Sequence, residues 1–306
     1  MKLKTILNKT KGYFSNDRYW VKALLILFIP AFFLCLGHIL SLGICKIGNI
    51  SDAVNQIRVA QVMLGLLVFV TSALILGFLF SRNPRKLLAL KEGNGMAILL
   101  SCVVALLSIP LINYITVLNE SLIPDSLGYI KELENKNDEL IRMMLDNMGI
   151  GGLLLNIFVM ALLPAVSEEL FFRGMILGTI RRSIKNPHIC IWITALLFGL
   201  IHFQIGKIIP IILMGGLFGY LRVWSKSLWL SITAHFTNNV VIVLYYFFIK
   251  GETYGMDPEN IGTSGTPWIL VVFAILFVAT LYDIHRLAKI GPRRTDIEEE
   301  GNKTLG

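Results

Sequence analysis

The chain has few charged residues and few cysteines for its length. Asp, Glu, Lys and Arg make up 16% of the 306 residues, whereas 55% are hydrophobic and the mean hydropathy is +0.69. Soluble domains carry about a quarter charged residues, so this composition excludes an ordinary soluble domain. The four cysteines form no CxxC pair and no loop framework, which argues against a disulfide scaffold and a thiol redox site. A His-Glu-x-x-His helix is also absent, so that signature gives no independent support for zinc.

The apolar residues are gathered into long runs, as a bilayer requires, because about 20 apolar residues cross one. We therefore predict an all-α, polytopic bundle of about eight transmembrane helices. The expected spans are residues 23–45, 60–80, 96–117, 152–182, 189–206, 208–222, 228–249 and 267–284. Only Lys207 separates the fifth from the sixth, which predicts either a tight turn at one membrane face or two segments that do not fully cross. The first run is too long for a signal peptide and is interpreted as a permanent span.

The basic residues test this map, because cytoplasmic loops of membrane proteins are rich in Lys and Arg. If the N-terminus is cytoplasmic, the cytoplasmic segments hold 20 of the 28 basic residues: Lys2, Lys4, Lys9, Lys11, Arg18, Lys22, Arg82, Arg85, Lys86, Lys91, Arg181, Arg182, Lys185, Arg222, Lys226, Arg286, Lys289, Arg293, Arg294 and Lys303. The external segments hold Lys46, Arg58, Lys131, Lys136, Arg142, Lys207 and Lys250. An odd number of spans would break this alternation, so both termini are predicted to be cytoplasmic. Topology and anionic lipid headgroups also account for the net charge of +8, without a nucleic-acid partner.

Three regions follow from the map. Residues 1–149 hold the first three spans and an external segment, residues 150–250 hold the polar core, and residues 251–306 hold the last span and a tail. The external segment, about 118–150, is either an amphipathic surface helix or a solvated loop. The tail from residue 293 onward is polar and is expected to be disordered.

Ionisable residues within spans are rare because each costs on the order of 2.5–3.5 kcal/mol to insert, so they usually have a partner and a task. One cluster stands out, on three of the spans: Glu168, Glu169 and Arg173 on the fourth, Phe198 and His202 on the fifth, and His235 and Asn239 on the seventh. The aromatic residues Phe171, Phe172, Trp192, Trp224 and Trp229 are expected to face lipid or the membrane interface.

Spacing on the helices suggests which of these groups meet. Glu169 and Arg173 are four residues apart and can pair on one face, whereas Glu168 lies about 100° around the helix and can meet another neighbour. A carboxylate can take a proton from water and return it to a leaving amine, and an imidazole with an Asn amide can stabilise an oxyanion. One Glu and two His would alternatively form a three-ligand zinc site, with Glu168, His202 and His235 as the candidates. The Glu169–Arg173 pair and the His235–Asn239 pair also have purely structural interpretations.

These residues resemble the motifs of a known family. Glu-Glu-x-x-x-Arg at 168–173, Phe-x-x-x-His at 198–202 and His-x-x-x-Asn at 235–239 are similar to the three signature motifs of the CPBP (Abi) family of CAAX-processing and bacteriocin-processing intramembrane proteases, related to the Rce1-type prenyl-protein endopeptidases. The resemblance covers roughly residues 150–248.

The resemblance implies roles for the matching positions. Glu168 would activate water with His202 as its partner, His235 and Asn239 would bind the oxyanion, and Glu169 with Arg173 would support the site. The family has been described both as zinc-dependent and as glutamate-dependent without metal; the second is favoured here. From the distances along the helices we expect the site near the membrane midplane, opening toward the cytoplasm.

The leading functional hypothesis is an intramembrane endopeptidase that cuts a membrane-associated peptide or protein. The Lys-rich and Ile-rich composition is typical of bacteria, which favours peptide maturation or bacteriocin self-immunity in the plasma membrane over true CAAX processing. The alternatives are a non-proteolytic membrane scaffold or bacteriocin-immunity protein of the same fold, and a transporter, for which paired broken helices are lacking. The sequence leaves substrate and oligomeric state open.

Overall fold

The computed structural model describes residues 10–124, 126, 128–145, 149–249 and 267–290. In these residues every regular element is helical, as predicted, and seven helices are long and apolar enough to cross a membrane. They are Tyr19–Ile47, Ala53–Phe80, Gly95–Ser121, Ile150–Ser183, Ile208–Ser225, Trp229–Phe248 and Trp268–Ala288. The protein is therefore an integral, multi-pass membrane protein.

Several of these spans consist of more than one labelled element. The labels are α2 (Tyr19–Ile47), α3 (Ala53–Met63), η1 (Leu64–Thr71), α4 (Ser72–Phe80), α5 (Pro84–Leu87), α6 (Gly95–Ser121), α7 (Gly128–Leu145), α8 (Ile150–Asn156), η3 (Ile157–Leu162), α9 (Leu163–Glu169), η4 (Leu170–Ile176), α10 (Leu177–Ser183), α11 (Pro187–Leu200), α12 (Ile208–Ser225), α13 (Trp229–Ile249) and α14 (Pro267–Ile290). The span Ala53–Phe80 joins α3, η1 and α4, and the span Ile150–Ser183 joins α8 through α10.

The fifth expected span, residues 189–206, is shorter than predicted. Helix α11 ends at Leu200, after 14 residues, so it rises only about 21 Å and falls short of a hydrocarbon core about 30 Å thick. The chain then turns through residues 201–207, where Phe203 takes a positive φ of 52° that an α-helix does not allow. Of the two segments that could have failed to cross fully, α11 is too short to cross, whereas α12 is long enough.

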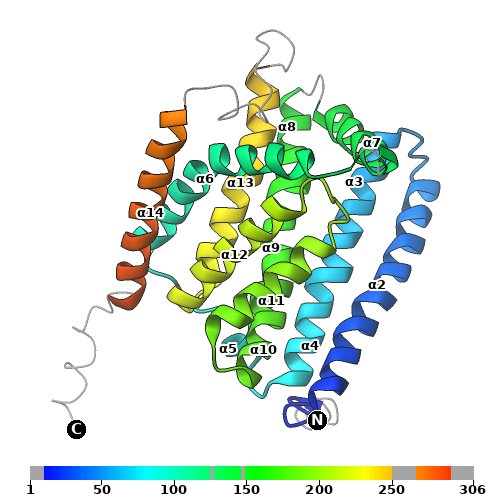
Figure 1. The fold of residues 1–306 in the computed structure, drawn as a ribbon. Coiled ribbons are helices and arrows are strands. Elements are labelled where there is room, and N and C mark those ends of the chain that lie inside the picture. Colours follow the sequence, from blue (N-terminus) through cyan, green and yellow to red (C-terminus); the bar gives the residue numbers. More distant parts are fainter. Residues whose placement is uncertain (1–9, 125, 127, 146–148, 250–266, 291–306) are drawn as a thin grey trace, which may run out of the picture.

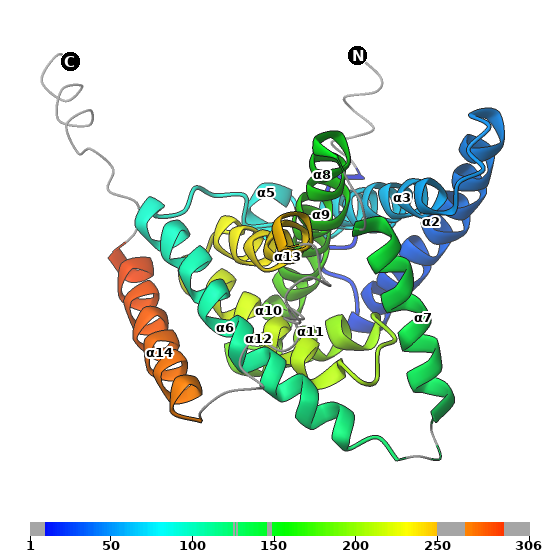
Figure 2. The same cartoon turned by 90° about the horizontal axis from the view of Figure 1, so that it is seen from above.

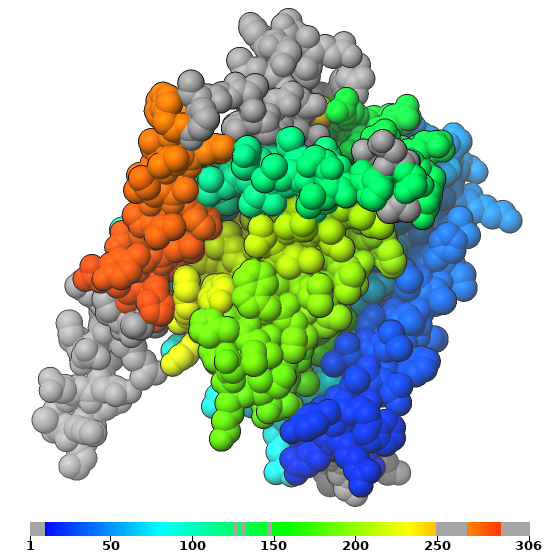
Figure 3. Space-filling model, in the orientation of Figure 1, coloured from blue at the N-terminus to red at the C-terminus, as the bar shows by residue number. Residues whose placement is uncertain are grey.

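The bundle has two opposite faces that define the geometry of the site (Figures 1 and 2). The N-terminal face consists of residues 10–18, 81–94, 181–187 and 225–228, near the start of α2 and the end of α14. The α7 face consists of residues 48–52, 119–124, 128–145 and 201–207. Helix α6 runs obliquely across the bundle to reach α7, and together they form a band above the exposed surface of α11 and α12 (Figure 3).

The external segment is a helix, α7, so the amphipathic-helix alternative is the one observed. Its buried residues Met144 and Leu145 lie at its C-terminal end. There the Met144 carbonyl accepts hydrogen bonds from Arg58 of α3 and Asn156 of α8. These bonds attach α7 to the spanning helices. The tail predicted to be disordered, from residue 293 onward, lies outside the described residues.

Two aromatic predictions are wrong. Phe171 and Phe172, expected to face lipid, are 6% and 1% exposed and pack with Phe69 and Phe198 in the largest apolar cluster. Trp192 and Trp229 are exposed, as expected for residues that contact lipid or the interface. The error arises because core and lipid are equally apolar in a membrane protein, so hydrophobicity alone does not distinguish an inward from an outward side chain.

The span that carries the paired glutamates is not a regular α-helix. It winds as a π-helix over Ile157–Leu162 and again over Leu170–Ile176, on either side of the short α-helix Leu163–Glu169. π-Helical turns are uncommon and occur frequently at functional sites. Glu168 and Glu169 thus lie between two wide turns, and the second of these turns contains Arg173.

Candidate active site

The predicted pair of Glu169 and Arg173 is present in the centre of the bundle. Nη1 of Arg173 donates to Oε1 of Glu169 at 2.7 Å, and both side chains are 0% exposed. Nη2 of Arg173 also donates to the carbonyl of Gly215 on α12, at 3.0 Å. The guanidinium lies 4.2 Å from the ring centroid of Phe198, close enough for a cation–π contact. Opposite charges and an aromatic face thus hold Arg173 in place without water.

The local contacts of Gly215 explain why a glycine is needed at this position. A Cβ at this position would lie 3.1 Å from the backbone Cα of Ala195 and 3.3 Å from Nη2 of Arg173. The missing side chain therefore permits both the approach of α11 to α12 and the hydrogen bond from Arg173. No sequence motif marks this carbonyl as a partner of the arginine.

His235 lies between the two glutamates. Its Nδ1 is 3.1 Å from Oε1 of Glu169, and its Nε2 is 4.0 Å from Oε2 of Glu168. Because an ionised carboxylate only accepts hydrogen bonds, the proton on this side of the ring is on Nδ1. The ring stacks on Phe218 of α12, with centroids 4.9 Å apart and planes inclined by 16°. Glu169 and Phe218 therefore fix both the tautomer and the orientation of His235.

The second histidine is held by its own helix turn. Nδ1 of His202 lies 2.6 Å from the carbonyl oxygen of Phe198, which can only accept, so Nδ1 carries the proton and Nε2 is left for another partner. The Phe198 ring packs against both imidazoles, with centroids 4.6 Å from His202 and 6.1 Å from His235. Oε2 of Glu168 lies 4.0 Å from Nε2 of His235. Helices α9, α11 and α13 therefore bring the two glutamates and the two histidines to one region of the bundle.

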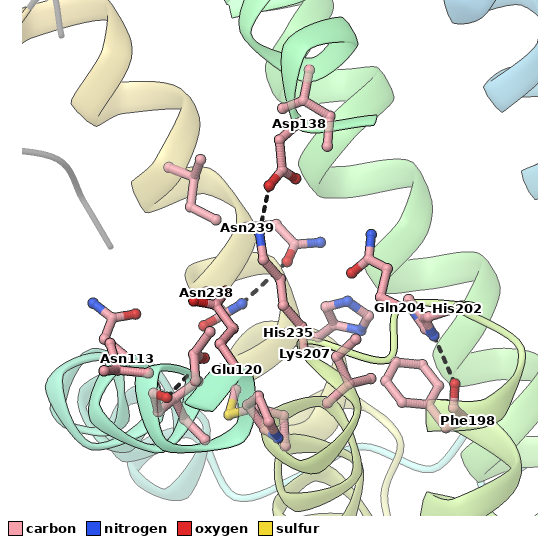
Figure 4. A pocket seen from close by; sticks show the side chains of 18 of the residues that line it. Asn113, Glu120, Asp138, Phe198, His202, Gln204, Lys207, His235, Asn238 and Asn239 are labelled. Atoms are coloured by element: carbon pink, nitrogen blue, oxygen red, sulfur yellow. Dashed lines mark hydrogen bonds and ion pairs between the residues drawn. The ribbon is translucent and has the colours of Figure 1, made fainter. Parts of the chain in front are cut away.

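The carboxamide of Asn239 is oriented by its neighbour. Nδ2 of Asn238 donates to Oδ1 of Asn239 at 3.3 Å, so the amide nitrogen of Asn239 can donate elsewhere. Both residues line the same cavity as His235, one turn of α13 away (Figure 4). Asn238 was not singled out from the sequence, although its place beside Asn239 was visible there.

A cavity of about 470 Å³ adjoins these groups, within the usual range for ligand pockets of about 300–1,000 Å³. Figure 4 shows His202, His235 and Phe198 toward one end of it and Asp138 of α7 toward another. Its polar lining consists of Asn113, Thr116, Glu120, Asp138, Arg142, His202, Gln204, Lys207, His235, Asn238, Asn239 and Tyr246. Glu168 is outside this lining and reaches the cavity at His235.

The cavity lies on the side of the α7 face. Its walls come from the second half of α6, from α7, from residues 202–207, from α12 and from α13. Both termini were predicted to lie on the face toward which the site opens. The two expectations, cytoplasmic termini and a cytoplasmic opening, do not hold together, because the cavity extends to the face opposite the start of α2. The estimate from the sequence used distances along single helices, which do not reveal where α6, α7 and the 201–207 turn meet.

The zinc alternative named Glu168, His202 and His235 as ligands. In the part of the chain that the structure describes, no three side chains of His, Cys, Asp or Glu are grouped so as to hold a metal ion. Nδ1 of His235 is bonded to Glu169 and Nδ1 of His202 to the carbonyl of Phe198, so the Nε2 atom of each ring is left for another partner. Addition of a chelator to the active protein tests the metal dependence of the reaction, and no step below is routed through zinc.

Comparison with known proteins agrees with the motifs. Residues 150–241 match the family described as type II CAAX prenyl endopeptidase Rce1-like, which confirms the resemblance drawn from the sequence. The uncharacterized protein YyaK of Bacillus subtilis (strain 168) is 30% identical over 118 residues, which are 36% of this chain. The chain spans only 39% of the length of this curated relative. No solved structure matches the chain.

Proposed function

We propose that this chain, whose residues 150–241 match the Rce1-like endopeptidases, is an intramembrane peptidase that hydrolyses a peptide bond of a membrane-associated peptide or protein. The observation that carries the proposal is the position of His235 between Glu168 and Glu169. A gap of 4.0 Å between Oε2 of Glu168 and Nε2 of His235 is too long for a hydrogen bond. One oxygen atom about 2.8 Å from each group would bridge it.

The reaction begins with the water that this gap can hold. Glu168 takes a proton from the water as its oxygen attacks the carbonyl carbon of the substrate, and His202 positions the water through its Nε2. The carboxylic acid formed on Glu168 then returns the proton to the leaving amine. General acid–base catalysis of this kind typically contributes about 10²- to 10⁴-fold in rate.

The developing oxyanion is stabilised by His235 and Asn239. Nδ1–H of His235 is bonded to Glu169, so when the ring is doubly protonated its Nε2–H can donate to the oxyanion. The Glu169 carboxylate stabilises the positive charge of this imidazolium. The Asn239 amide nitrogen adds a second donor. Arg173 touches neither water nor substrate in this scheme; it is a positioning residue, since it neutralises the buried carboxylate of Glu169.

The proposed place of action is the plasma membrane of a bacterium, with both termini in the cytoplasm. The support is the basic character of the N-terminal face, which matches the rule that Lys and Arg gather on the cytoplasmic side. The substrate class in such a membrane is a peptide precursor or another membrane-associated chain, including the peptides handled in bacteriocin maturation or self-immunity.

The test compares the membrane peptides of cells that express the wild type, Glu168→Gln or His202→Ala, using mass spectrometry. Glu168→Gln keeps the side-chain volume and removes the base, so we expect the products of the wild type to fall at least about 100-fold. Glu132→Gln, an exposed carboxylate change on α7, is the matched control and should keep the wild-type profile. Identical membrane-peptide profiles in the wild type and all variants would contradict the peptidase proposal and favour a binding scaffold. A chelator added to purified wild-type enzyme separates a carboxylate-only reaction from a metal-dependent one.

A further inference from the structure

Hydrogen bonds between distant segments define the N-terminal face of the bundle. On the N-terminal face, Arg182 at the end of α10 donates to the carbonyl of Phe80 and to Ser81, and Ser227 donates to the carbonyl of Lys91. The ends of α4, α10 and α12 and the start of α13 therefore lie at one level. The residues that enter the cavity wall from α6 and α7 belong to the other face.

The two faces differ in charge. Among the described side chains, the N-terminal face carries Lys11, Arg18, Arg82, Arg85, Lys86, Lys91, Arg181, Arg182, Lys185 and Lys226 against Asp17 and Glu92. The α7 face carries Lys136, Arg142 and Lys207 against Asp52, Glu120, Glu132, Glu134, Asp138 and Glu139. The first face is strongly basic, whereas the second has more acidic than basic residues. By the positive-inside rule the N-terminal face is cytoplasmic and the α7 face is external.

An apolar layer separates the polar groups of the site from the N-terminal face. Its buried members come from four parts of the chain and form one continuous cluster: Leu87, Leu88, Phe171, Phe172, Met175, Ile176, Phe198, Leu228 and Ile232. Phe172 and Leu88 are each 1% exposed, and so is Leu228, which directly precedes α13 and lies seven residues before His235. Close-packed apolar side chains leave no room for water, so the basic face offers no aqueous route to Glu168 through this cluster.

The α7 face does offer a route. The cavity runs from His235 to Asp138 of α7 and Glu120 near the end of α6. The turn of residues 201–207 follows a helix that rises only about 21 Å, and α7 is bound to this turn. Glu134 accepts the backbone N–H of Gly206 at 2.9 Å, and Asp138 pairs with Lys207 at 2.9 Å. Polar groups therefore line the path from α7 to the site.

We propose that the cavity is entered from the extracytoplasmic side, so that the substrate is a peptide, or a segment of a membrane protein, that has already reached the outer face of the membrane. That the entering molecule is a substrate rests on the proposed peptidase function, whereas the side of entry is independent of that function. It follows from the cavity's extension to the α7 face, the apolar layer behind the site and the charge difference between the faces.

The test measures water access to the cavity from each side and needs no catalysis. In a variant with Cys35, Cys45, Cys102 and Cys190 changed to Ser, single cysteines are introduced as Thr116→Cys in the cavity, Lys136→Cys on the outside of α7 and Lys185→Cys on the N-terminal face. Intact protoplasts and detergent-permeabilised protoplasts are treated with a membrane-impermeant, negatively charged maleimide. Labelling is read as a mass shift of the purified full-length chain.

The expected result is labelling of Thr116→Cys and Lys136→Cys in intact protoplasts, at least about tenfold above that of Lys185→Cys, which reacts only after permeabilisation. The proposal is overturned if Thr116→Cys reacts only after permeabilisation, or does not react in either condition. The reverse pattern for Lys136→Cys and Lys185→Cys would overturn it as well, since the α7 face would then be cytoplasmic. A loss of peptidase activity in the separate Glu168→Gln experiment leaves each of these outcomes unchanged.

Discussion

Removal of the Glu169 carboxylate tests how far the buried ion pair holds the bundle together. In Glu169→Ala, the guanidinium of Arg173, which is 0% exposed, loses its only carboxylate at hydrogen-bond distance in the described structure. Breaking a buried pair by removal of one partner costs about 3–5 kcal/mol, because an uncompensated charge stays in the interior. His235 also loses the acceptor for its Nδ1–H. We therefore expect at least about 3 kcal/mol of destabilisation.

Two further variants calibrate this value. Glu169→Gln keeps an oxygen that can accept from Arg173 and His235 and loses only the charge, so its effect should fall below that of Glu169→Ala. Glu132→Ala removes the same kind of i,i+4 carboxylate from Lys136, in a pair whose side chains are 69% and 64% exposed. Exposed pairs contribute about 0.2–1 kcal/mol. The expected order of destabilisation is Glu169→Ala, then Glu169→Gln, then Glu132→Ala.

The assay is reversible unfolding of the purified protein in mixed detergent and SDS micelles, followed by the fluorescence of its five tryptophans. The free energy of unfolding is compared among the four proteins at one lipid and detergent composition. Equal stabilities of Glu169→Ala and Glu132→Ala, within about 0.5 kcal/mol, would refute the reasoning. Arg173 would then have to be neutralised by something other than Glu169.

Two other predictions use the same preparations. Gly178→Ala should destabilise the protein by about 1–3 kcal/mol in the unfolding assay, because the added Cβ would lie 2.6 Å from the backbone carbonyl of Leu87, whereas Gly43→Ala, with nothing within 4 Å, should be neutral or slightly stabilising. Asp138→Asn should speed hydrogen exchange at residues 201–207, since it removes the ion pair to Lys207, and high salt should produce the same increase in the wild type; unchanged exchange would show that α7 is held by other contacts.

Much of the fold was predictable because lipid imposes a simple rule. Each spanning segment needs a long apolar run, and the described part of the chain contains seven helices of that kind. The exception shows the limit of the rule. Ile201, Phe203 and Ile205 continue the apolar run of α11, so hydropathy extended the helix to residue 206, whereas the backbone turns after Leu200. Hydropathy measures side chains and does not detect a turn made of apolar residues.

The site was predictable in part. The i,i+4 spacing of Glu169 and Arg173 correctly indicated their pairing, because both atoms of that contact belong to one helix. The contacts of His235 with two carboxylates depend on how α13 is rotated relative to α9, and no spacing within one helix encodes that rotation. The face toward which the cavity opens could not be predicted for the same reason, since it depends on where α6, α7 and the 201–207 turn meet in space.

The two π-helical segments of this span determine the directions in which its glutamate side chains point. Asn156, before the first segment, is bonded to α3 and α7, and Arg182, after the second, is bonded to the end of α4. Between these anchors, one residue more or less per segment turns a side chain by about 100°. A transplant of this glutamate pair into a regular α-helix of another bundle would preserve each residue and still aim the carboxylates at the wrong neighbours. Anyone who redesigns this span must copy its winding as well as its sequence.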